Sequence, residues 1–172
     1  TIKNKVLQLA DKPEIISGSY IIREGETLYS FYTATAAGVD PATGEQLYWA
    51  WDTDENGVKG KKYITNDMAK ATACKEIQGS RIPDLYGSIN NTFKYKGFDL
   101  SIFFQWSYGN DVLNANRLFF ENVNNSRNLN QYATYADRWT PENPNSNIPA
   151  ATNSSSNLVI SSRVVEDASF LR

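Results

Sequence analysis

The chain has 172 residues, of which 41% are hydrophobic and 13% aromatic, and its formal net charge is −2. This apolar content argues against disorder throughout the chain, and the near-neutral charge gives no electrostatic footprint for nucleic acid. The lack of histidine excludes Ser-His-Asp and Cys-His nucleophile systems and argues against zinc, and the single cysteine, Cys74, excludes an internal disulfide.

The N-terminal part of the chain is predicted to form strands and turns. Residues 4–9 alternate between polar and apolar side chains, which predicts a short strand. Residues 18–36 hold two aromatic or β-branched runs around an Arg-Glu-Gly-Glu turn, so we expect a hairpin there. Residues 38–46 carry turn chemistry, because Pro41 fixes φ and Gly44 permits a positive φ.

Helical character is expected in one stretch. Residues 65–77, "TNDMAKATACKEI", combine a capping residue with good helix formers. The expected N-cap is Thr65 or Asn66.

The clearest pattern lies in residues 85–108, where two alternating runs flank Lys96-Gly97. Gly97 supplies the backbone angle that a tight hairpin needs. The second run, about nine residues long, fits the ~9–11 residues of a tilted transmembrane strand. Alternation alone fits a soluble β-sandwich equally well. One face of the second run carries Phe98, Leu100, Ile102, Phe104 and Trp106, and the other carries Asp99, Ser101, Phe103 and Gln105.

The connections around this hairpin are unequal in length. Residues 109–163 form an Asn- and Ser-rich connection far beyond the ~12–15 residues usual for loops in compact domains. Residues 38–82 form a second long excursion, whereas the hairpin turn is minimal. Short turns on one side and long loops on the other are typical of outer-membrane barrels. The final residues, "SFLR", are expected to belong to a further strand.

Four segments are characteristic: "GVDPATGEQLYW", "IPDLYGSINNTFKYKGFDLSIFFQWSYGNDVLN", "ADRWTPENPNSNIP" and "SSRVVEDASFLR". In this order they resemble the C-terminal part of the SusC/RagA family of TonB-dependent outer-membrane transporters. The resemblance covers roughly residues 4–172, and the hairpin and "DRWTPENP" are its specific parts. Ser88 departs from the family, which often has a second glycine there, and this difference affects packing only.

The resemblance implies an all-β fold, in which antiparallel strands form part of a large transmembrane β-barrel with long extracellular loops and at most one short helix. Residues 1–172 would be the C-terminal portion of the barrel and supply roughly six to eight of about 22 strands, with the plug and the N-terminal strands absent. The implied location is the bacterial outer membrane.

The function implied by the resemblance is TonB-dependent import of a glycan or peptide. The implied partners are a SusD-like surface lipoprotein, the TonB system through the missing N-terminal part, an oligosaccharide or peptide ligand, and the lipid bilayer. Nucleic acid is not expected as a partner. The alternative is a soluble β-sandwich that binds carbohydrate. Burial of Leu100, Ile102 and Phe104 in a compact core would favour that alternative.

Four aromatic residues are candidates for ligand or partner contact. Tyr48, Trp49 and Trp51 lie within four residues, with Trp49 and Trp51 expected on one face of a strand and Tyr48 on the other. Trp139 lies in the family-like segment. Each ring could pack against neighbouring loops or form a stacking platform, and for Trp139 a structural anchor is the favoured interpretation.

A calcium loop is a weaker candidate. Asp52, Asp54 and Asn56 in "DTDENG" match the opening of such a loop, but its twelfth position is Tyr63 instead of a bidentate glutamate. A polar surface turn is therefore the favoured interpretation, and no other cofactor is expected. No catalytic residues are assigned, and the chain is not expected to be an enzyme.

Overall fold

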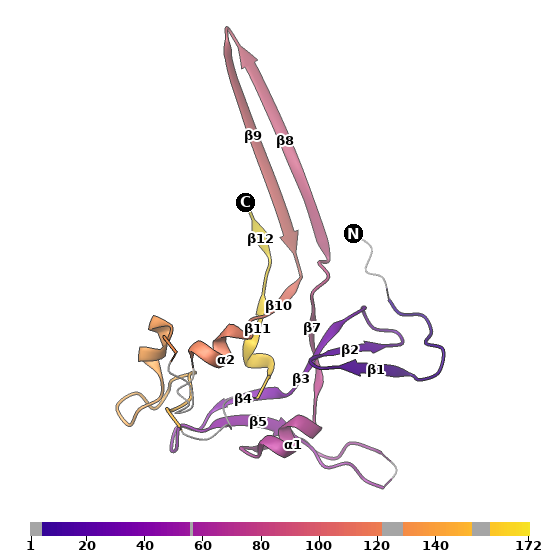
Figure 1. The fold of residues 1–172 in the computed structure, drawn as a ribbon, viewed down its shortest axis with the longest axis vertical. Helices are drawn as coiled ribbons and strands as arrows, with labels where there is room; N and C mark the ends of the chain where they lie inside the picture. Colours follow the sequence, from indigo (N-terminus) through magenta and orange to yellow (C-terminus); the bar gives the residue numbers. More distant parts are fainter. Residues whose placement is uncertain (1–4, 56, 122–128, 153–158) are drawn as a thin grey trace. The chain divides into compact units, whose positions relative to one another are not determined.

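The computed structural model describes residues 5–55, 57–121, 129–152 and 159–172 (Figure 1). Strands dominate the described residues, as the expected all-β class requires. No described helix is long and apolar enough to span a membrane. The chain forms two compact units, the first from Thr1–Phe31, Gly79–Val112 and Glu166–Arg172, the second from Tyr32–Gln78 and Leu113–Val165.

The first unit contains the predicted hairpin as its longest element. Strands β8 (Leu85–Tyr95) and β9 (Phe98–Tyr108) pair antiparallel over their whole length, from Leu85 opposite Tyr108 to Tyr95 opposite Phe98 (Figure 1). The two turn residues both have positive φ, 45° at Lys96 and 89° at Gly97. This is the turn geometry whose twist matches paired strands, so the predicted role of Gly97 is confirmed.

A third strand extends this sheet. Strand β12 (Phe170–Leu171) pairs antiparallel with β9, and the sheet order is β12-β9-β8. Two backbone hydrogen bonds of 2.8 Å between Gln105 and Arg172 continue the pairing. The strand expected at the final residues is thus confirmed. Neighbouring strands β9 and β12 are joined through the long connection that leaves β9 at Gly109, which is the meander order of a barrel wall.

A smaller sheet has the order β1-β2-β3-β7. The predicted hairpin at residues 18–36 is confirmed as the pair β2 and β3, and an unpredicted strand, β1, pairs with the other edge of β2. The bounds of these strands are β1 Glu14–Ser17, β2 Tyr20–Arg23, β3 Ser30–Thr33 and β7 Glu76–Ser80.

The strand predicted at residues 4–9 is wrong. Within its described part, only Lys5 makes a β-bridge, to Thr27. The backbone groups of Val6 bond instead to the β2–β3 turn, at Glu26 (3.0 Å) and Gly25 (2.8 Å). Alternation is therefore present, but the partner of this segment is a turn and not a strand. Residue 4 lies outside the described residues.

The second unit is built on a three-stranded sheet, β4 (Thr35–Val39), β5 (Gln46–Ala50) and β6 (Tyr63–Thr65). The expected turn between β4 and β5 is present. Its Asp40 carboxylate accepts hydrogen bonds from the Ala42 amide (2.9 Å) and the Thr43 hydroxyl (2.8 Å). These bonds hold the pKa of Asp40 below its usual value.

The predicted helix is present but shorter. Helix α1 spans Met68–Ala73, and its N-cap is Asp67 in place of Thr65 or Asn66. The Asp67 carboxylate accepts from the amides of Ala69 (2.8 Å) and Lys70 (3.3 Å). Thr65 ends strand β6, so the helix starts only after the chain leaves the sheet. Glu76 and Ile77 belong to strand β7.

Two small apolar clusters form the core of the second unit. One joins Ala34, Tyr48 and Ala71, and the other joins Ala50, Trp51 and Cys74. The Cys74 thiol donates to the carbonyl of Trp51 (3.1 Å) and is buried, as expected for a structural cysteine.

The connection between β9 and β12 has more local structure than the sequence indicates. A second short helix, α2, and two 3₁₀ helices occur in it, although at most one short helix was expected; none reaches seven residues. The bounds are β10 Asp111–Leu113, α2 Asn116–Phe120, η1 Ala133–Asp137, η3 Ser162–Val164 and β11 Val165–Asp167.

The number of strands able to cross a bilayer is also lower than expected. Strands β8 and β9 have 11 residues each, whereas the other described strands have two to five. The expectation of six to eight barrel strands from this chain is therefore wrong, because most of its length forms loops with short sheets of their own.

The cap of α1 can be tested locally. Asp67→Ala is expected to raise amide hydrogen exchange at Ala69 and Lys70 several-fold, because losing an N-cap side chain weakens a helix by about 1 kcal/mol. Mass spectrometry on the intact protein measures this exchange. The control is Asn66→Ala, at the position favoured by the sequence. Equal effects of both substitutions would contradict the assignment of the cap to Asp67.

Candidate functional site

One face of the hairpin exposes mainly apolar side chains, with Asn91 as the polar exception. Leu100, Ile102 and Phe104 are 56%, 36% and 45% exposed, respectively. The register places Phe93 opposite Leu100 and Ile89 opposite Phe104, so the apolar sides of the two strands coincide as predicted. A soluble domain buries such a face against a core, and large exposed apolar patches mark interaction or membrane surfaces. The condition that would favour the soluble β-sandwich is not met.

The other face of the hairpin is mostly polar. The Ser101 hydroxyl bonds to Asn90 (3.1 Å), and Lys94 lies 3.5 Å from the carboxylate of Asp99. Phe103 is the apolar exception on this face. Each 11-residue strand is ~36 Å long, enough to cross a bilayer at the tilt usual in barrels. Exposed aromatic side chains lie at both ends of the hairpin, Tyr95 and Phe98 at the turn and Tyr86 and Tyr108 at the other end.

Tyr48 and Trp51, two of the four candidate contact residues, lie in the interior of the second unit. Tyr48 is buried against Ala34 and Ala71. Burial raises the pKa of Tyr48 to about 12, although the positive charge of Arg163 acts in the opposite direction. Trp51 is buried beside Cys74, and the ammonium of Lys59 lies 4.1 Å from the centre of its ring.

Trp49 and Trp139 have different surroundings. Trp49 is half-buried on the face of β5 opposite to Tyr48, where it pairs with the exposed Ile64 of β6. The indole of Trp139 donates to the carbonyl of Pro41 (3.1 Å), and its ring covers Gly44, where a Cβ would lie 2.5 Å from the ring. Trp139 thus anchors its segment to the β4–β5 turn. Ligand contact by these four residues stays a prediction.

The carboxylates of the candidate calcium loop take part in hydrogen bonds within the loop. Asp52 accepts from the Tyr63 hydroxyl (2.9 Å), and Asp54 accepts from the Val58 amide (2.8 Å). Asn56 lies outside the described residues. No group of three or more Asp, Glu, Cys or His residues suited to a metal occurs in the described part of the chain. Both aspartates thus have partners within the loop, and calcium binding by Asp52, Asp54 and Asn56 stays a prediction.

An ionic cluster inside the second unit was missed from the sequence. Glu121, which is buried, accepts from the guanidinium groups of Arg117 (2.9 Å) and Arg163 (2.8 Å). Burial lowers the pKa of Arg163, and the charge of Glu121 opposes that shift. The i,i+4 spacing of Arg117 and Glu121 could have indicated the first pair. Nothing local in the sequence indicates Arg163, which lies 42 residues further on.

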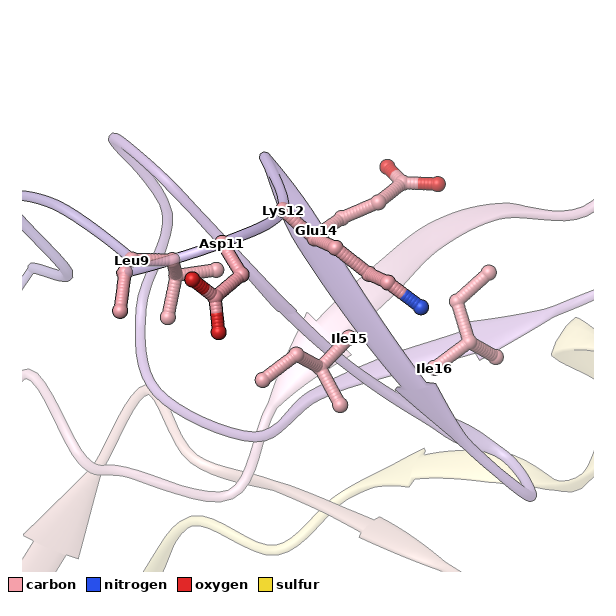
Figure 2. A pocket seen from close by; sticks show the side chains of 7 residues that line it. Leu9, Asp11, Lys12, Glu14, Ile15 and Ile16 are labelled. Carbon is pink, nitrogen blue, oxygen red and sulfur yellow. The ribbon is translucent and has the colours of Figure 1, made fainter.

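The described residues also line two open hollows, the second of which includes Asp52 and Tyr63 of the candidate calcium loop. One, of about 450 Å³, is lined by the segment before β1 and by β1 itself, with Leu9, Asp11, Lys12, Glu14, Ile15 and Ile16 around it (Figure 2). The other, of about 500 Å³, is lined by residues of the second unit that include Asp52, Lys61, Lys62 and Tyr63. Neither was predicted.

No family model matches the chain. It is 31% identical to TonB-dependent receptor P3 of Formosa agariphila over 196 aligned residues, covering 99% of this chain and 18% of that receptor. It is 38% identical over 125 residues to TonB-dependent receptor P26 of the same organism, covering 69% of this chain and 12% of the receptor.

Solved structures give the same class. The RagAB peptide transporter matches with a TM-score of 0.74 and 26% identity, over 94% of this chain and 17% of the transporter chain. The RagAB peptide importer in its closed-closed state matches with a TM-score of 0.75 and 25% identity, over 96% and 18% of the two chains. None of these relatives is named as an enzyme. This chain spans less than a fifth of the length of each relative.

The β8–β9 hairpin with its exposed apolar face, the meander order of strands β8, β9 and β12, and the long connections define a segment of an outer-membrane β-barrel transporter. Within that class, the chain belongs to the TonB-dependent receptors of the SusC/RagA type.

The membrane orientation of β9 can be tested with two adjacent positions. Ile102→Lys is expected to lower the free energy of unfolding of the intact receptor in lipid by about 2–4 kcal/mol, because a lysine near the bilayer midplane faces hydrocarbon. Ser101→Lys, on the opposite face, is the control and is expected to have a small effect. Denaturant unfolding in lipid vesicles measures both. A reversed order would mean that the two faces are assigned the wrong way round.

The burial of Tyr48 predicts a pH effect. Since its pKa is about 12 when folded and 10.0 ordinarily, its contribution to stability is fully present below pH 10 and is lost as the pH rises through about 12. Tyr48→Phe is expected to reduce the loss of stability over this interval and to remove a phenol whose pKa is about 12. A phenolate absorbance titration checks this. An unchanged titration would contradict the burial.

Proposed function

We propose that this chain forms part of the wall and extracellular mouth of a transporter that imports an oligomeric nutrient, an oligosaccharide or a peptide, by TonB-dependent uptake. The observation that carries the proposal is the β8–β9 hairpin, which turns an apolar face to its surroundings and has 11-residue strands. A soluble carbohydrate-binding module is not favoured, because soluble domains rarely expose such a large apolar face to water.

The placement of the chain in the receptor follows from the connections. The two-residue turn at Lys96-Gly97 belongs on the periplasmic side, where barrel turns are short. The ends of β8 and β9 near Leu85 and Tyr108 then lie on the extracellular side, and the long connections build the mouth. Residues 1–172 are proposed to be the C-terminal portion of the barrel, with the plug and N-terminal strands in the remainder of the receptor.

The proposed partners follow the family. A SusD-like surface lipoprotein closes the mouth over the captured ligand, and the TonB system acts on the plug to open a path. Among ligands, a peptide is favoured, because the structural neighbours are described as peptide transporters. Glycan stacking has less support, since Tyr48 and Trp51 are buried and Trp139 packs on the β4–β5 turn. Of the four aromatics, Trp49 is the one proposed to contact ligand or partner.

The function is tested by uptake in the native host. Cells that lack the receptor gene, and wild-type cells treated with a protonophore, are expected to lose uptake of a fluorescently labelled tryptic digest. Labelled oligosaccharides serve as the parallel probe for glycan import. The tagged receptor is expected to copurify with a surface lipoprotein. Unchanged uptake of both probes in the deletion strain would contradict the proposal.

A further inference from the structure

Arg81 lies over two tyrosine rings of the first unit. The central carbon of its guanidinium is 4.6 Å from the centre of the Tyr29 ring and 6.0 Å from that of Tyr20. The two rings are themselves in edge-to-face contact, with their centres 6.5 Å apart and an interplanar angle of 88°. These distances are within the range of cation–π attraction, and the stack restricts the orientation of a side chain that is otherwise flexible.

Arg81 is exposed. Within the described residues, its guanidinium has no carboxylate partner. Other arginines differ: Arg23 pairs with Glu14 at 2.8 Å, and Arg117 and Arg163 share Glu121. The guanidinium N–H groups form a planar fork, and cation–π contact with a ring does not use them as hydrogen-bond donors. That fork matches the two oxygens of a carboxylate.

The backbone is fixed on both sides of Arg81, to β10 before it and to the hairpin after it. The Ser80 amide donates to the Asp111 carboxylate (3.0 Å), and the Asp84 amide donates to the carbonyl of Tyr108 (2.9 Å). Arg81 therefore sits on a short, held connection between β7 and β8. This is the end of the hairpin opposite the Lys96-Gly97 turn, which the proposed function places outside the cell.

Tyr29, below Arg81, adopts an unusual backbone conformation. Its φ is +54°, in the left-handed region that favours glycine, and Tyr29 and Lys96 are the only non-glycine residues with positive φ in the described part of the chain. Lys96 is explained by the hairpin turn. At Tyr29 this backbone conformation accompanies the contact between the tyrosine ring and the Arg81 guanidinium. Non-glycine residues in unfavourable backbone conformations concentrate at binding sites.

An open hollow lined by apolar and charged side chains lies beside β1 of the small sheet. Tyr20 and Ile22 share one face of β2, and Ile22 pairs with Ile15 of β1. Ile15 and Leu9 line the open hollow in Figure 2. A mixed apolar and charged lining suits a peptide, which carries both kinds of side chain, better than a glycan, which lacks apolar side chains.

We propose that Arg81, positioned by Tyr29 and Tyr20, binds a carboxylate of the imported peptide at the extracellular mouth. The assignment rests on the proposed function and adds the chemistry of the ligand. A bidentate bond between a guanidinium and a carboxylate is expected to favour carboxylate-bearing peptides over their esters by about tenfold.

The test uses the intact receptor in complex with its lipoprotein, immobilised and incubated with one of two probes. The first probe is a tryptic digest of serum albumin, and the second is the same digest with its carboxylates methyl-esterified. Retained peptides are quantified by mass spectrometry. Wild type is expected to retain the free-acid digest about tenfold better, and Arg81→Gln is expected to lose this preference while it still retains the esterified digest.

Three further variants separate binding from structure. Arg138→Gln removes another arginine that stacks on a tyrosine, Tyr135, at 5.2 Å, and is expected to keep the wild-type preference. Arg81→Lys keeps the charge but not the planar fork, so an intermediate preference is expected. Tyr29→Gly suits the positive φ and removes the ring, so a reduced preference cannot be assigned to backbone strain.

Each outcome decides the proposal. An unchanged preference in Arg81→Gln overturns it, as does equal loss of both digests or a loss of lipoprotein binding alone, which would make Arg81 a structural or partner contact. A wild type that retains both digests equally overturns the carboxylate site but leaves peptide uptake standing. If the wild-type receptor retains neither digest, that result contradicts the proposed peptide uptake and, with it, the proposed carboxylate site.

Discussion

Backbone pairing of β8 and β9 over 11 residues each is the constraint on which the other features depend. The pairing fixes register, and because side chains alternate, register decides which residues face outward. With Tyr95 opposite Phe98, most apolar side chains of both strands fall on one side, while Phe103 lies on the other. A shift of β8 by one residue would bring the polar residues Lys94, Thr92 and Asn90 onto the apolar side. The two-residue turn sets the register, and the face that results requires hydrocarbon around it.

The long connections depend on a different kind of interaction. Neither is held by a large apolar core, since the buried clusters of the second unit contain three residues each. Distant segments are joined instead by polar contacts such as Glu121 with Arg163 and Trp139 with Pro41. Buried charges are strongly destabilising when one partner is removed, so such pairs tolerate few alternative arrangements. A connection built this way can be long and still keep a defined structure of its own.

The sequence predicted the parts of the fold that local patterns determine. The hairpin, its turn and its two faces follow from alternation and from Gly97, and the β4–β5 turn follows from its turn residues. The cap of α1 was placed one or two residues early, because Thr65, Asn66 and Asp67 are all good caps and the end of strand β6 decides between them. The segment at residues 5–9 alternates, but its partner is a turn.

The site was less predictable because its contacts are non-local. The richness in aromatic residues indicated Tyr48 and Trp51 as candidates for ligand or partner contact. The alternation of side chains along β5 does not reveal which face of the strand is buried, and in the structure Tyr48 lies in the core. Arg81 and Tyr29 are 52 positions apart and match no motif. A positive φ at tyrosine is invisible in a sequence, whereas one at glycine is expected. The edge of β8 away from β9 adds a last constraint: unpaired backbone groups are too costly in lipid, so neighbouring strands of the receptor must cover it.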